Sequence, residues 1–125
     1  MDKIELKRRT RKFAVEVTKF IEKQPSGRAL NVLCNQLIRS SSSVGANYRS
    51  ACRGESSADF INNIIIVEEE ADESLYWLEL MEESNLVRVE DLIALKKEAD
   101  ELTAIFTAIG KTAKTNQQNN KSKKS

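Results

Sequence analysis

The chain has 125 residues and a net charge of +1, with 40% hydrophobic and 31% charged residues. This length suits one domain with a sizeable core, and one proline and four glycines leave too few turn residues for an all-β fold. No apolar run approaches the ~20 residues that cross a membrane, and the N-terminus lacks a secretion signal, so we expect a cytoplasmic protein without membrane contact.

The first predicted helix spans about residues 4–23 and is basic in its first half. Its apolar stripe has helical spacing and consists of Leu6, Phe13, Val17 and Phe20. Cations near a helix N-terminus oppose the helix dipole, which indicates that they serve another purpose. The candidate phosphate-binding residues of this segment are Arg8, Arg9, Arg11 and Lys12.

Small polar residues occupy the middle of the second predicted helix, which follows the break at residues 24–27 and ends at Gly54. Apolar residues keep near-helical spacing at Leu30, Leu33, Leu37, Val44, Tyr48 and Ala51. Between them lie the serines of residues 40–43, Gly45, and the arginines Arg39, Arg49 and Arg53. Small residues on a packed face let a neighbouring backbone come close, so packing is the first interpretation and binding the second.

The third predicted helix begins after Ser56 and has more apolar residues than one packed face needs. Its core stripe consists of Phe60, Ile64, Val67, Ala71, Leu75 and Leu78. Off this stripe lie Ile61, Ile65, Tyr76, Trp77 and Leu80. They indicate a second buried face, either within the bundle or between subunits, and Ile61, Ile65 and Trp77 are the candidate oligomer-interface residues.

The fourth predicted helix starts near residue 90 and is expected to fade near Gly110. Its apolar stripe consists of Leu92, Leu95, Leu102, Ile105 and Ile109. Residues 111–125 are rich in Lys, Asn, Gln and Ser and are expected to form a flexible basic tail. Four amphipathic helices with short turns predict an all-α, up-down-up-down antiparallel four-helix bundle as a single domain over residues 1–110.

Positive and negative charges are divided between two halves of the chain. Residues 1–54 hold twelve Lys/Arg and four Asp/Glu, whereas residues 55–110 hold three Lys/Arg and fifteen Asp/Glu. Two interpretations are open: the halves attract each other within or between subunits, or the basic half forms a nucleic-acid-binding face. Exposed ion pairs contribute only ~0–1 kcal/mol each, so the asymmetry alone does not decide between them.

The sequence offers few residues that could carry out catalysis or bind a metal. There is no histidine, which removes the commonest general base and metal ligand. Cys34 and Cys52 would lie ~27 Å apart on one helix, too far for a disulfide or a shared metal ion. The four consecutive serines offer hydroxyls but have no base to activate them. We therefore expect no enzymatic activity, no metal and no cofactor.

Four motifs resemble those of the bacterial 23S rRNA intervening-sequence proteins. They are Gln36-Leu-Ile-Arg-Ser40, Ser43-Val-Gly-Ala-Asn-Tyr-Arg49, Ala58-Asp-Phe-Ile61 and Leu75-Tyr-Trp-Leu-Glu-Leu80. Within them we assign structural roles to Gln36, Ser40, Ser43, Asn47 and Tyr48, and we expect the Asn47 amide to bond a buried group. The resemblance, which covers about residues 13–110, implies a four-helix bundle that assembles into a homopentamer. The fold also resembles the accessory protein of diversity-generating retroelements, which is thought to bind nucleic acid.

Two functional hypotheses follow. The leading hypothesis is a non-catalytic, homo-oligomeric protein that binds RNA or DNA through the candidate arginines and lysine of the first two helices. The alternative is a protein–protein adaptor or structural oligomer, in which Arg39, Arg49 and Arg53 pair with acids of the third helix. Burial and pairing of these arginines would favour the structural role, whereas exposure beside the first-helix cations would favour binding.

Overall fold

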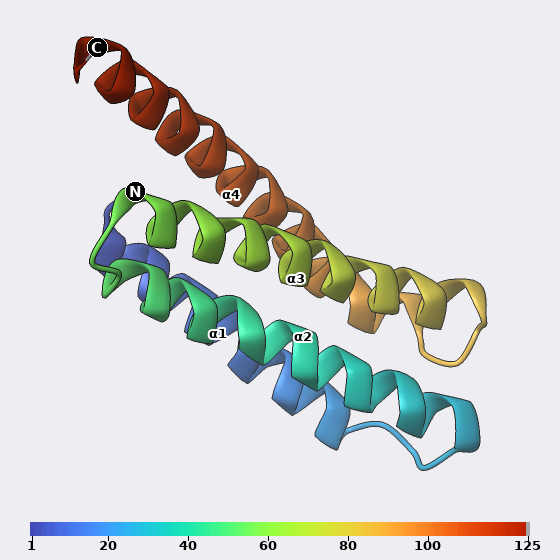
Figure 1. Cartoon of the computed structure of the whole chain (residues 1–125). Coiled ribbons are helices and arrows are strands. Elements are labelled where there is room, and N and C mark those ends of the chain that lie inside the picture. The colour runs from blue at the N-terminus through green and yellow to red at the C-terminus, as the bar shows by residue number, and fades with distance from the viewer. Residues whose placement is uncertain (125) are drawn as a thin grey trace.

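The computed structural model describes residues 1–124, which form a bundle of four α-helices (Figure 1). The helices are α1 (Lys3–Glu22), α2 (Arg28–Cys52), α3 (Ser57–Glu83) and α4 (Val89–Lys124). Short turns join successive helices, so α2 packs between α1 and α3, and α3 packs between α2 and α4. The predicted all-α, up-down-up-down antiparallel bundle is confirmed.

The core lies along the bundle axis and draws large apolar side chains from every helix. Fully buried members are Phe13, Val17, Leu37, Val44, Ile64, Leu78, Leu102 and Phe106. Burial of each such side chain contributes ~1.5–3 kcal/mol to folding. The stripes predicted for α1 and α2 are the buried faces of these helices, apart from the half-buried Leu33.

Small residues bring α2 close to both of its neighbours. An extra carbon on Gly45 would meet Oγ1 of Thr10 at 3.4 Å and the backbone nitrogen of Arg11 at 3.5 Å. The backbones of α1 and α2 therefore nearly touch at this level. On the side of α2 that faces α3, the buried Ser40 lies against the buried Ser74. The small residues of α2 thus serve packing, as their first interpretation predicted.

α3 buries a different set of residues from the predicted stripe, because it packs against both α2 and α4. Ile61, Ser74 and Met81 are buried, whereas Phe60 and Leu75 are only half-buried. Ile61 is therefore buried within the bundle, which is one of the two alternatives given for the residues off the stripe.

α4 does not end near Gly110 but continues without a break to Lys124. Gly110 is buried, does not have a positive φ, and lies against Ile64 of α3. It is therefore a packing residue rather than a helix terminator, and the predicted helix end is wrong. The division into a domain over residues 1–110 and a flexible tail over residues 111–125 stays a prediction, and residue 125 lies outside the described residues.

Candidate nucleic-acid interface

Arg9 belongs to the predicted phosphate-binding residues, but its guanidinium is engaged within the bundle. Its Nε and Nη2 donate hydrogen bonds to the two carboxylate oxygens of Glu98 in α4, at 2.8 and 2.6 Å. Hydrogen bonding to Glu98 raises the pKa of Arg9 and outweighs the opposite effect of burial. Because α1 and α4 share few other contacts, this bidentate pair stabilises the interface between them, which we call the seam.

Arg39 also serves the bundle, by joining α2 to α3. Its guanidinium donates to both carboxylate oxygens of Glu70, at 3.3 and 3.4 Å, and to Oε1 of Glu73. Nε1 of Trp77 donates to the same oxygen of Glu73 at 3.3 Å. The hydrogen bond to Glu73 is the main cause of the raised pKa of Arg39. This residue therefore has the role that the adaptor hypothesis expects of it.

The other candidate cations face solvent. Among residues 1–124 none of them has an ion-pair partner, whereas Arg9 and Arg39 do. We call these residues the exposed cation group, and its members are Arg8, Arg11, Lys12, Arg49 and Arg53.

The two helices that carry the exposed cation group place it toward one end of the bundle. Gly45 packs on Thr10, and α1 and α2 are antiparallel, so Arg49, one turn beyond Gly45, lies level with the first turns of α1. Nζ of Lys3 lies 5.9 Å from the centre of the Phe60 ring, which places the start of α3 at the same end. The structure thus places Arg49 at the same level of the bundle as basic residues of α1 that are about 40 positions away in the sequence.

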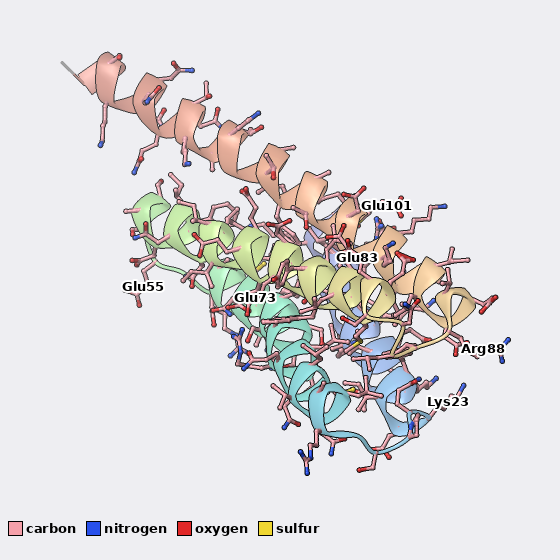
Figure 2. The ribbon with its side chains drawn as sticks, turned by 90° about the vertical axis from the view of Figure 1, so that its right-hand side faces the viewer. Lys23, Glu55, Glu73, Glu83, Arg88 and Glu101 are labelled. Atoms are coloured by element: carbon pink, nitrogen blue, oxygen red, sulfur yellow. The ribbon has the colours of Figure 1, made fainter. Side chains whose placement is uncertain are left out.

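Cations outnumber acids at one end of the bundle. The starts of α1 and α3 and the ends of α2 and α4 share the end at which Figure 2 labels Glu55. We call this the basic end. Lys23 and Arg88 label the opposite end in Figure 2. This end carries charges of both signs. Its exposed or half-buried acids include Glu79, Glu82, Glu83, Glu90 and Asp91, and its exposed cations include Arg28 and Lys97 besides the two labelled residues.

A groove of about 1160 Å³ runs between α1 and α4. Its apolar floor includes the buried Phe13, Phe20 and Leu95. Its walls carry both signs of charge, namely Glu5, Arg8, Arg9, Lys12, Glu16, Lys19, Lys23, Asp91 and Glu98. Mixed charge gives no preference for a polyanion, so the groove as a whole is not the candidate nucleic-acid interface, although Arg8 and Lys12 of the exposed cation group stand on its wall.

The motif residues of α2 contribute to packing and to local hydrogen bonding. The ring of buried Tyr48 contacts that of Phe106 in α4 with centroids 5.3 Å apart, and burial raises the pKa of its hydroxyl. Three other motif side chains bond within α2, Gln36 to the Arg39 side chain, Ser43 to the Arg39 carbonyl and Asn47 to the Ser43 carbonyl. The half-buried Asn47 thus bonds its own helix rather than another one.

The candidate oligomer-interface residues of α3 differ in how much surface they offer. Ile61 is 7% exposed, and Ile65 and Trp77 are half-buried. Ile66 and Tyr76 are 39% and 55% exposed, on the side of α3 that faces away from the core. Sequence reasoning placed Tyr76 off the core stripe but chose neither Tyr76 nor Ile66 as an interface residue, and at 3.6 residues per turn their side chains lie about 80° apart around α3.

Two other features, a metal-binding group and a membrane-spanning helix, were sought among the described residues. Within residues 1–124, no three Cys, Asp or Glu side chains are grouped so that they could hold a metal ion. None of the helices in this part of the chain is both long enough and apolar enough to span a membrane.

Comparisons with known proteins identify relatives of this chain. The family model described as 23S rRNA-intervening sequence protein matches residues 2–108. A similar fold, with a TM-score of 0.75, is found in the crystal structure of a protein of unknown function from the S23 ribosomal protein family of Bacteroides thetaiotaomicron VPI-5482. The two sequences are 33% identical, and the match covers 85% of this chain and 98% of that chain. No curated protein matched the sequence.

Proposed function

The chain belongs to the 23S rRNA-intervening sequence protein family, and we propose that it is a non-catalytic, oligomeric protein that binds RNA or DNA. The observation that carries this proposal is the exposed cation group, whose five side chains face solvent without an ion-pair partner in the described chain. Such cations are available to phosphate groups. Arg9 and Arg39 are left out of the binding residues because Glu98, Glu70 and Glu73 engage them.

Binding through the exposed cation group would be electrostatic and nearly independent of base sequence. Contacts from Lys and Arg to phosphates position a nucleic acid but read no bases. Base stacking needs exposed aromatic rings, but Phe13, Phe20, Tyr48 and Phe106 are buried. The exposed Tyr76 lies on α3, whose exposed neighbours Asp72 and Glu79 would repel phosphates. We therefore expect a steep dependence of affinity on salt.

The oligomer is proposed to be a pentamer, as the family resemblance implies. Ile66 and Tyr76 supply exposed apolar surface on α3 for a subunit contact, with the half-buried Ile65 and Trp77 nearby. Light scattering at micromolar concentration should give the mass of five chains. A stable monomer at that concentration would rule out the assembly.

A protein–protein adaptor or structural oligomer is the second candidate function. It is favoured by the use of Arg9 and Arg39 in ion pairs between helices, and by the exposed apolar pair Ile66 and Tyr76. In this case the exposed cation group would contact acidic protein surface rather than phosphate.

The two candidates can be separated by identifying what copurifies with the protein. One preparation should be washed at low salt and another at high salt, and the nucleic acid that stays bound to the protein in each should be sequenced. Samples treated with ribonuclease and deoxyribonuclease serve as controls. The proposal predicts nucleic acid of varied sequence that the high-salt wash removes. A preparation free of nucleic acid at low salt, together with a discrete copurifying protein, would favour the adaptor.

A further inference from the structure

The last turns of α4 extend beyond the family match, which ends at residue 108. We call residues 111–124 the C-terminal arm. Figure 1 shows this part of α4 diverging from the other helices and projecting past them at the basic end. The arm is therefore a feature of this chain that the matched region of the family does not include.

Only the root of the arm packs against the bundle. Ala113 and Gln117 are half-buried, and Ala113 lines a shallow pocket with Phe60 and Ile109. The other described side chains of the arm, through Ser122, are exposed. The arm also has no apolar stripe after Ala113. Because an isolated helix of this length is marginal in water, a partner that binds the arm would stabilise it.

One face of the arm carries three lysines. Lys111, Lys114 and Lys121 follow a spacing of three and seven residues, which places them on the same side of a helix, and Gln118 lies between them. All three lysines are exposed, and no carboxylate of residues 1–124 pairs with them. The ten residues from Lys111 to Lys121 rise ~15 Å along the helix, which matches about four nucleotides of one strand.

The partner that fits this face is a nucleic-acid backbone. Three unpaired cations in a row are complementary to a line of phosphates, and the Gln118 amide can bond phosphate or sugar oxygens. A lipid surface would require an apolar face beside the lysines, and the exposed part of the arm has none. The arm projects from the basic end, where Lys3 of α1 contacts Phe60 at the arm's root.

We infer that the C-terminal arm is a second nucleic-acid contact, in which Lys111, Lys114 and Lys121 bind the phosphate backbone of a strand held at the basic end. This inference rests on the proposed function and extends it to a part of the chain outside the family match. The protein would then hold one nucleic acid at two separate positions, the exposed cation group and the arm.

The test compares two triple variants of the full-length protein that lose the same charge. The arm variant is Lys111→Gln/Lys114→Gln/Lys121→Gln. The control variant, Lys23→Gln/Arg28→Gln/Lys97→Gln, removes three exposed cations nearer the opposite end, none of which has an ion-pair partner in the described chain. Circular dichroism and light scattering confirm that both variants keep fold and assembly. Fluorescence anisotropy with labelled single-stranded RNA and DNA of about 20 nucleotides then gives the dissociation constant at several salt concentrations, from which the number of phosphate contacts follows.

The inference predicts that the arm variant binds more weakly and that the slope of log K against log salt falls by about 2, at ~0.7 per lost single-strand contact. The control variant should keep the slope of the unmodified protein. If the arm variant also keeps that slope while the unmodified protein binds, the arm contact is wrong and the proposed function stands. If both variants lose affinity equally, net charge rather than the arm is responsible. If the unmodified protein binds neither the RNA nor the DNA probe, the proposed function and this inference both fail.

Discussion

The hydroxyl oxygen of Ser74 in α3 lies 2.8 Å from that of Ser40 in α2, and both side chains are completely buried. Each hydroxyl also lies within hydrogen-bond distance of a carbonyl of its own helix, that of Leu37 for Ser40 and that of Glu70 for Ser74. Two small residues face to face let the helices approach, and their mutual hydrogen bond removes the cost of burying polar atoms. Arg39 closes the same interface at its solvent edge.

Replacing the serines of this pair, singly and together, should have non-additive effects on the stability of the bundle. Ser40→Ala or Ser74→Ala should each lower the free energy of unfolding by about 1 kcal/mol, because one partner of a buried hydrogen bond is lost. The double variant should cost less than the sum, since no hydroxyl is then left with a missing partner. Urea unfolding measures these values, with the exposed Ser42→Ala as the control. Strict additivity would show that the two hydroxyls do not interact.

The contact between α1 and α2 at Gly45 should tolerate one carbon but not a large side chain. In Gly45→Ala the new carbon meets Thr10 at 3.4 Å, an ordinary contact, and alanine favours helix by up to about 1 kcal/mol. Gly45→Leu should push the helices apart and cost about 1–3 kcal/mol. The exposed neighbour in Ala46→Leu serves as the control. If Gly45→Leu unfolds at the same urea concentration as Ala46→Leu, the close approach of α1 and α2 is wrong.

The ion pair between Arg9 and Glu98 should stabilise the seam between α1 and α4. A double-mutant cycle with Arg9→Gln and Glu98→Gln should give a coupling energy of about 1 kcal/mol, because the pair is bidentate and half-buried. A second cycle, with Arg8→Gln in place of Arg9→Gln, should give no coupling because Arg8 has no such contact. Equal coupling in the two cycles would mean that general charge attraction, and not the Arg9 contact, joins the helices.

Gly110→Ala should stabilise the protein by up to about 1 kcal/mol, because alanine is the better helix former and the new carbon meets only Ile64 at 3.6 Å. This outcome depends on α4 continuing through Gly110 to form the C-terminal arm. Thermal unfolding followed by circular dichroism provides the measurement. A helix that ended at a left-handed Gly110 would instead be destabilised by alanine.

The bundle could be predicted from the sequence because its helices have strong apolar periodicity, as in the stripe from Leu6 to Phe20. The end of α4 could not be predicted, because Ala113 is the one apolar side chain among residues 111–124, and composition alone suggested that this segment would not order. What composition missed is that Gly110 packs on Ile64, so the helix passes through it.

Which arginines pair with acids and which stay exposed could not be predicted either. Arg8 and Arg9 are adjacent in sequence, but only Arg9 points to Glu98 across the seam. Likewise, Arg39 reaches Glu70 and Glu73, whereas Arg49 stays exposed on the same helix. Which cation meets an acid depends on the register between helices that are far apart in sequence, and periodicity within one helix does not specify that register.

The central claim is that exposed and unpaired cations of α1 and α2 bind nucleic acid, and its most direct test is the salt dependence of binding by Arg8→Gln/Arg11→Gln/Lys12→Gln. Arg9 is kept because its loss would weaken the bundle. Affinity for single-stranded RNA or DNA should fall for all sequences alike, and the slope of log K against log salt should fall by about 2. The control variant Lys23→Gln/Arg28→Gln/Lys97→Gln should keep the original slope. Absence of binding by the unmodified protein at ~50 mM salt, or an unchanged slope in the α1 variant, would contradict the claim.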